Sequence, residues 1–62
     1  MRIVIEVKAG MPVNCWTFIN RKEALAFIKK HDVMKAHEDN CWHEGLMHNW
    51  WIFEPNKGGM NV

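Results

Sequence analysis

The sequence contains no serine, no glutamine and no tyrosine, and Thr17 is its only threonine. Without serine, acyl transfer by a serine nucleophile is excluded. No apolar run approaches the ~18 residues that a membrane-spanning helix needs, so the pattern predicts no membrane contact. The chain is also short, because 62 residues allow one small domain and leave little scaffold for a catalytic cleft. We therefore expect a protein that is not an enzyme.

The net charge is small, since eight Lys and Arg residues against seven Asp and Glu residues leave a formal charge of +1. This balance is unsuited to a function that depends on phosphate contacts. The two signs are separated along the chain. Residues 21–37 hold five basic and two acidic residues (net +3), and residues 38–54 hold four acidic residues and no basic one (net −4). Two faces of opposite sign would orient a protein partner.

Cysteine is scarce, with only Cys15 and Cys41. Two cysteines can form at most one disulfide, whereas small secreted domains are commonly held by several. The chain begins MRIVIEVK, where charged residues interrupt the apolar ones, so we expect no signal peptide. These two features predict a cytoplasmic protein with both thiols reduced.

Two strands are predicted near the N-terminus. Residues 2–8 alternate, and we expect their β-branched members to form the buried face, with Val4 as the one exception: Ile3, Ile5 and Val7. Glycine and proline signal a turn over residues 9–12, and residues 13–19 form the second strand. The short connection favours an antiparallel hairpin.

A helix follows the hairpin. Asn20 is a suitable N-cap, and Glu23 stands three residues later, as in a capping box. Apolar residues then recur at helical spacing, and we expect the helix to end near His31 or Asp32. Residues 33–37 are predicted to form an irregular extra turn or a second short helix.

The C-terminal part of the chain predicts one or two more strands. Residues 49–54 give the strongest pattern, and residues 41–43 allow a second tight hairpin with Glu44 and Gly45 at its turn. Pro55 ends the last strand, and residues 56–62 are predicted to be a flexible tail.

The order of these elements predicts an α+β fold. We expect residues 1–55 to form a single compact domain, a small antiparallel sheet of three to four strands with one helix packed on one face. The order is strand, strand, helix, then one or two strands. Four tryptophans and three phenylalanines supply the large buried areas that a short chain needs.

Metal-capable residues are frequent between the helix and the last strand. His37, Cys41, His43 and His48 offer the imidazole and thiolate ligands that zinc prefers, and a bound metal would stabilise a small domain. The spacing matches no standard zinc finger, because no Cys-x2-Cys pair is present. We expect no cofactor and keep a zinc site at these residues as an alternative.

Nucleic-acid binding is a second alternative. Lys29 and Lys30 lie on the polar side of the predicted helix, where they would contact phosphates, and Trp16 or Trp50 would stack on a base. The near-neutral charge and the acidic stretch oppose such a partner, and a basic helix face is also what solvent exposure alone requires.

The last strand is apolar on both faces. Because strand residues alternate, Trp50 and Ile52 cannot share a face with Trp51 and Phe53, and a single helix leaves one pair for a partner or a second copy of the chain. We expect Trp51 and Phe53 to be the core pair. Aromatic side chains commonly anchor protein interfaces. The predicted partner-binding residues are Trp16, Trp42, Trp50, Trp51, Phe53, Lys29 and Lys30.

In size and character the chain resembles the small proteins that phages encode to bind and disable a host factor, anti-CRISPR proteins among them. The resemblance implies a compact single-sheet domain without a cofactor that acts by occupying a surface. We therefore predict a non-catalytic protein-binding module, an inhibitor of a larger host or defence protein. A homodimer is compatible with the same surface.

Overall fold

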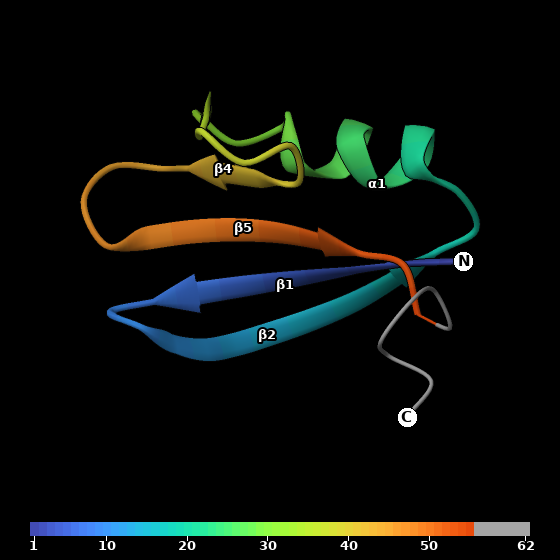
Figure 1. Ribbon diagram of the computed structural model, residues 1–62, viewed down its shortest axis with the longest axis horizontal. Helices are drawn as coiled ribbons and strands as arrows, with labels where there is room; N and C mark the ends of the chain where they lie inside the picture. The colour runs from blue at the N-terminus through green and yellow to red at the C-terminus, as the bar shows by residue number, and fades with distance from the viewer. Residues whose placement is uncertain (56–62) are drawn as a thin grey trace.

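The computed structural model describes residues 1–55, which form one antiparallel sheet of five strands and one helix (Figure 1). Along the chain the elements are β1 (Arg2–Lys8), β2 (Met11–Phe18), α1 (Arg21–Ile28), β3 (Met34–Lys35), β4 (Cys41–His43) and β5 (His48–Phe53). Their order across the sheet is β2-β1-β5-β4-β3. The predicted α+β class is confirmed, but the predicted three to four strands are too few. The tail predicted for residues 56–62 lies outside the described residues.

The strand missing from the prediction is β3. Met34 pairs with His43 and Lys35 with Trp42, and Ala36 N donates to Cys41 O at 3.0 Å beyond this pair. The expected extra turn or second short helix at residues 33–37 is therefore wrong. Two residues are too few to show an alternating pattern, so only the pairing with β4 reveals this strand.

The β1–β2 hairpin is confirmed, although its turn is shorter than the predicted residues 9–12. Lys8 pairs directly with Met11, which leaves Ala9 and Gly10 as the two turn residues. Both have positive φ, 52° and 80°, as in the two-residue turns whose twist matches that of the flanking strands. β2 therefore begins two residues before the predicted start.

Helix α1 begins where its capping residue predicts and ends early. The Asn20 side chain accepts a hydrogen bond from Glu23 N at 2.9 Å, which confirms the N-cap. The helix ends at Ile28 rather than near His31, because His31 N bonds Ile28 O at 3.0 Å, three residues back, and tightens the chain into a turn. Within residues 1–55 no helix has the length and hydrophobicity to cross a membrane.

The core lies between α1 and one face of the sheet, and Figure 1 shows α1 to one side of the strands. Register places Val4 of β1 between Trp16 of β2 and Ile52 of β5, so these side chains share the helix-covered face. The residues buried together are Val4, Ala24, Ile28, Trp42, Trp50 and Ile52. Half-buried aromatic side chains, Trp16, Phe18 and Phe27, pack around them.

Two predictions about the core are wrong. Ile3, Ile5 and Val7 are half-buried on the face away from α1, and their neighbour Val4 is the buried residue. In β5, Trp50 is 1% exposed, whereas Phe53 is 42% exposed. The physical reason is the register, which joins the even-numbered residues of both strands into the face that α1 covers.

Candidate functional site

The face of the sheet opposite α1, the open face, is formed by alternate residues of all five strands. Register sets Ile3 between Thr17 and Phe53, and Ile5 between Cys15 and Trp51. Its members are Ile3, Ile5, Val7, Cys15, Thr17, Met34, Cys41, His43, Asn49, Trp51 and Phe53. In residues 1–55 no helix covers this face, so its apolar side chains other than the buried Cys41 are left half-buried or exposed.

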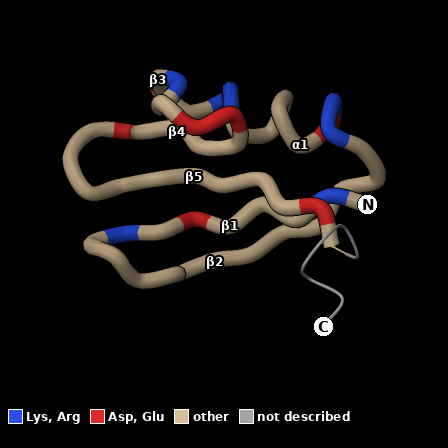
Figure 2. The backbone as a smooth tube through the Cα atoms, viewed as in Figure 1, with Lys and Arg blue, Asp and Glu red and all other residues tan. Residues whose placement is uncertain are grey.

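The open face carries no Lys, Arg, Asp or Glu. β2 and β5 contain no Lys, Arg, Asp or Glu, and they are drawn tan along their length in Figure 2. The charged residues of β1 are Arg2, Glu6 and Lys8, which alternate with the open-face residues and therefore point to the helix side. An uncharged apolar patch of this kind is typical of an interaction surface.

Two aromatic rings occupy the middle of the open face. Trp51 and Phe53 stack with ring centroids 6.0 Å apart and an interplanar angle of 19°. Phe53 borders an apolar hollow of about 250 Å³ that is also lined by Ile3, Ile5, Glu54 and Pro55. Trp51 borders a second hollow of about 210 Å³, lined also by Ala36, His37, Glu38, Cys41, His43 and Asn49. The ring pair thus stands between two hollows of a size that receives side chains.

The residues predicted as zinc ligands are not brought together. His37, Cys41 and His43 border the second hollow, but His48 lies on the helix side of the sheet, against Glu6. His43 Nδ1 lies 2.5 Å from Asn49 Oδ1. Within the described residues, no group of three or more His, Cys, Asp and Glu side chains is arranged to hold a metal ion.

The two cysteines are free thiols in different surroundings, Cys15 exposed and Cys41 buried. Burial raises the pKa of the Cys41 thiol, and the nearby carboxylate of Glu38 raises it further. A thiol in this state is protonated at neutral pH, and it is then a poor nucleophile and a poor metal ligand.

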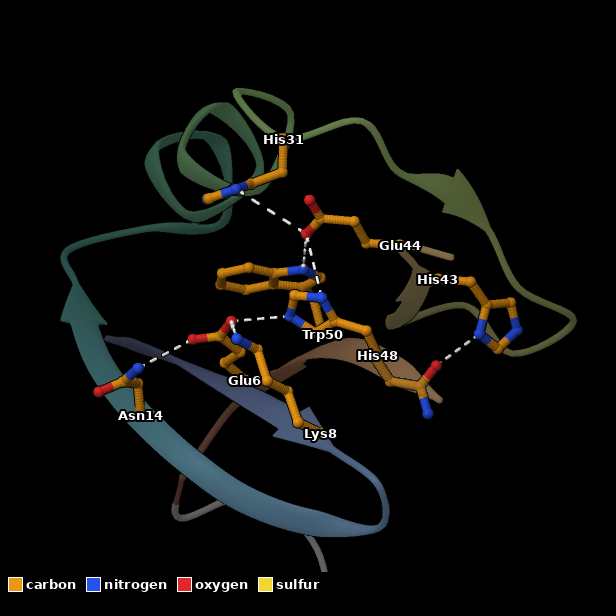
Figure 3. Close-up of polar contacts among 9 residues, drawn as sticks. Glu6, Lys8, Asn14, His31, His43, Glu44, His48 and Trp50 are labelled. Atoms are coloured by element: carbon orange, nitrogen blue, oxygen red, sulfur yellow. Dashed lines mark hydrogen bonds and ion pairs between the residues drawn. The ribbon is translucent and has the colours of Figure 1, made fainter. Parts of the chain in front are cut away.

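A polar network lies on the helix side, beyond the end of α1 (Figure 3). The buried carboxylate of Glu6 accepts a hydrogen bond from Asn14 Nδ2 at 2.9 Å and lies 2.7 Å from His48 Nε2. Burial alone raises the pKa of the Glu6 carboxyl, but these two hydrogen bonds and the positive charges nearby outweigh burial. The pKa of Glu6 therefore lies below its ordinary value of 4.5.

Glu44 links the same network to α1. Its Oε1 accepts a hydrogen bond from Trp50 Nε1 at 2.8 Å and lies 3.6 Å from His48 Nδ1 and 3.9 Å from His31 Nδ1. Among residues 1–55 no buried side-chain polar atom lacks a partner, so these groups satisfy one another. The network fastens the β4–β5 loop to β1 and to the end of the helix.

The structure divides the predicted partner-binding residues between two sides. Trp51 and Phe53 lie on the open face. Trp42 and Trp50 are buried beneath α1, and Trp16 packs on Phe27 with ring centroids 4.8 Å apart. The remaining two, Lys29 and Lys30, are exposed at the end of α1, on the opposite side of the sheet.

Sequence reasoning missed Ile3 and Ile5 as members of the exposed surface. The alternation of residues 2–8 sets Ile3 and Ile5 on one face of the strand, but it does not indicate which face the helix covers. No family model, curated protein or solved structure shows significant similarity to the chain.

Proposed function

We propose that the protein is a non-catalytic protein-binding module whose docking surface is the open face. The observation that carries the proposal is an uncharged sheet face on which Ile3, Ile5, Trp51 and Phe53 are partly accessible. Burying such side chains against a partner removes apolar surface from water, which is the main driving force of association.

The chemistry of the face favours one kind of occupant, an apolar patch of another protein. A nucleic acid or an acidic peptide needs positive charges to pair with, and the open face has none. Lys29 and Lys30 are on the other side of the molecule, away from Trp51 and Phe53. The hollow beside Phe53 suits an aliphatic or aromatic side chain from the partner.

The proposal extends to the role of such binding. A small domain that binds a partner through one face of its sheet acts by covering part of the partner's surface. The phage-encoded inhibitors that the chain resembles in size act in this way. We propose that the partner is a larger host or defence protein in the cytoplasm. The free thiols of Cys15 and Cys41 are compatible with that compartment.

The experiment compares two substitutions of exposed apolar residues by lysine. Phe53→Lys places a charge on the open face, and Leu46→Lys places one on the β4–β5 loop, where Leu46 is 95% exposed. Proteins retained by the immobilised chain from cells that naturally produce it are purified, and their Kd is measured for the wild type and both variants. Circular dichroism verifies that each variant is folded.

We expect Phe53→Lys to raise the Kd by about thirtyfold or more, the loss typical of an anchor residue (~2 kcal/mol), and Leu46→Lys to leave it unchanged. Equal affinity for all three chains, or the failure of any protein to bind, would show that the open face is not a docking surface.

A further inference from the structure

The two edges of the sheet are protected to different degrees. β3, at one edge, has two residues, one of them Lys35. β2, at the other edge, has eight residues, none of them charged (Figure 2). Short strands and charged side chains are the usual means that keep a sheet edge from pairing with another chain. β3 has both of these features and β2 has neither.

The directions of the backbone groups in β2 follow from the pairing of the inner strands. Ile52 N of β5 donates to Asn40 O at 2.9 Å, on the side of β4. Both backbone groups of a strand residue point to the same side, and those of the next residue point to the opposite side. Val4 stands opposite Ile52 and also points away from this pair, so the N–H and C=O of Val4 are directed to Trp16 of β2.

Cys15 and Thr17, the neighbours of Trp16, therefore direct their N–H and C=O groups to the outside of the sheet. Both residues are exposed, and within residues 1–55 no strand lies beyond β2. The first half of this edge is interrupted, because Pro12 has no N–H and a register shift leaves Val13 bulged. The place for a further strand is thus the second half of β2, where two N–H and two C=O groups point outward.

A hollow adjoins the outward groups of Thr17. Its volume is about 370 Å³, its lining is largely apolar, and its residues are Met1, Thr17, Phe18 and Ile19. The Thr17 side chain lies on the open face, opposite Ile3. Paired residues on neighbouring strands have their side chains on the same face. A residue that paired with Thr17 would therefore direct its side chain to the open face, beside this hollow.

We infer that the outer edge of β2, at Cys15 and Thr17, binds an extended segment of another protein, which joins the sheet as a sixth strand. The outward N–H and C=O groups are matched by the backbone of a strand and not by a helix, whose own backbone groups bond one another. The segment is uncharged and apolar where it faces Thr17, because no side chain of β2 or of the hollow is charged.

The strand contact continues the open face. Thr17 stands opposite Ile3, and Ile3 stands opposite Phe53, so a side chain at the hollow lies in line with the open-face residues. The inference therefore rests on the proposed function, since the segment belongs to the protein that covers the open face. It adds a backbone contact, which fixes the direction and register of the partner on the sheet.

The probe for this edge is a capped five-residue peptide of alternating threonine and valine, N-methylated on its threonines. Methylation blocks one edge of the peptide, which prevents self-association and leaves the valine N–H groups to pair with β2. The control peptide has the same residues and is methylated on its valines instead. Both are titrated into the ¹⁵N-labelled protein, and the amide chemical shifts give the Kd. We expect only the first peptide to shift the amide signals of Cys15 and Thr17 and to slow their exchange with solvent.

Two substitutions at Thr17 test the same contact from the side of the protein. Thr17→Pro removes one outward N–H and leaves the pairing of Trp16 with β1 in place, so it should raise the Kd of the peptide about tenfold or more. Thr17→Val retains the N–H with a side chain of the same shape and should keep the wild-type Kd. Circular dichroism verifies that both variants are folded.

Failure of both peptides to bind, or equal binding of the two, would overturn the inference. So would a wild type that dimerises when Thr17→Pro stays monomeric in sedimentation equilibrium, because the edge would then belong to a second copy of the chain.

The edge contact and the open face fail separately. Phe53 lies on β5, two strands from the outer edge, so Phe53→Lys is expected to leave peptide binding unchanged. If the peptide did not bind while Phe53→Lys still weakened the protein partner, only the edge contact would be wrong. If the peptide bound as expected while Phe53→Lys left the partner's Kd unchanged, only the open face would be wrong.

Discussion

Ile3 on β1 and Phe53 on β5 stand directly opposite each other on the face of the sheet that α1 leaves uncovered. The next pair along the same strands, Val4 and Ile52, faces α1 and is buried. One residue along each strand therefore separates a core pair from an accessible pair, because strand side chains alternate between faces. The same two strands hold the domain together on one face and present an apolar surface on the other.

This alternation predicts opposite outcomes for two substitutions in β5. Trp50→Ala should unfold the domain, because truncating a buried aromatic side chain costs roughly 3–5 kcal/mol and so small a protein has little more stability than that. Phe53→Ala should cost about 1 kcal/mol or less, since Phe53 is 42% exposed. Urea unfolding followed by circular dichroism measures both. Similar losses in the two variants would mean that the open face is covered.

The hairpin turn predicts a stabilising substitution. Ala9 has a φ of 52°, a conformation that is costly for alanine and well tolerated by asparagine. Ala9→Asn creates an Asn-Gly turn, the preferred sequence for this hairpin, and should raise the free energy of unfolding by about 0.5–1 kcal/mol. Ala26→Asn, at an exposed position of α1, should lower it instead. Thermal unfolding of the wild type and the two variants measures these changes in stability. A lower unfolding midpoint for Ala9→Asn than for the wild type would refute the strained-turn explanation.

The elements that could be predicted from the sequence are those encoded by neighbouring residues. The alternation of β1, the Asn20 cap and the breaks at Gly10 and Pro55 are local signals, and each marks an observed element or boundary. The two-residue strand β3 exists only through its pairing with β4, so no local pattern indicates it.

The faces of β1 could not be assigned from local sequence. Its covered face holds Glu6, a charged residue that makes this face appear solvent-exposed. The structure buries Glu6 because Asn14 and His48 bond its carboxylate, and His48 is 42 positions away along the chain. Without that distant partner, the face with Ile3 and Ile5 is the reasonable choice for the core. The candidate site was therefore only half predictable, with Phe53 in the expected partner-binding set and Ile3 outside it.

The two cysteines should differ strongly in reactivity. Cys15 is exposed, whereas burial raises the pKa of the Cys41 thiol and keeps it protonated. We expect iodoacetamide at neutral pH to alkylate Cys15 quickly and Cys41 only after unfolding, because the thiolate is the reactive form. Mass spectrometry of the digested protein gives both rates, and the same measurement in urea is the control. Comparable native rates would contradict the burial of Cys41.

The carboxyl of Glu6 predicts how stability depends on acid. Its pKa in the folded state lies below the ordinary value of 4.5, so the unfolded chain binds a proton more readily. The stabilisation is therefore complete above about pH 4.5, the unfolded-state value, and it is lost as the pH falls through the lower folded-state pKa.

Glu6→Gln tests this dependence, because glutamine keeps the shape of the side chain and does not titrate in this range. The free energy of unfolding of the wild type should fall between pH 5 and the lower pKa of Glu6, and that of Glu6→Gln should fall less steeply. Glu38→Gln, at an exposed carboxyl, should keep the slope of the wild type. Urea unfolding at a series of pH values provides the three slopes. If Glu6→Gln and Glu38→Gln showed the same slope, the acid sensitivity would arise elsewhere, and the bonds from Asn14 and His48 would not be what keeps Glu6 charged.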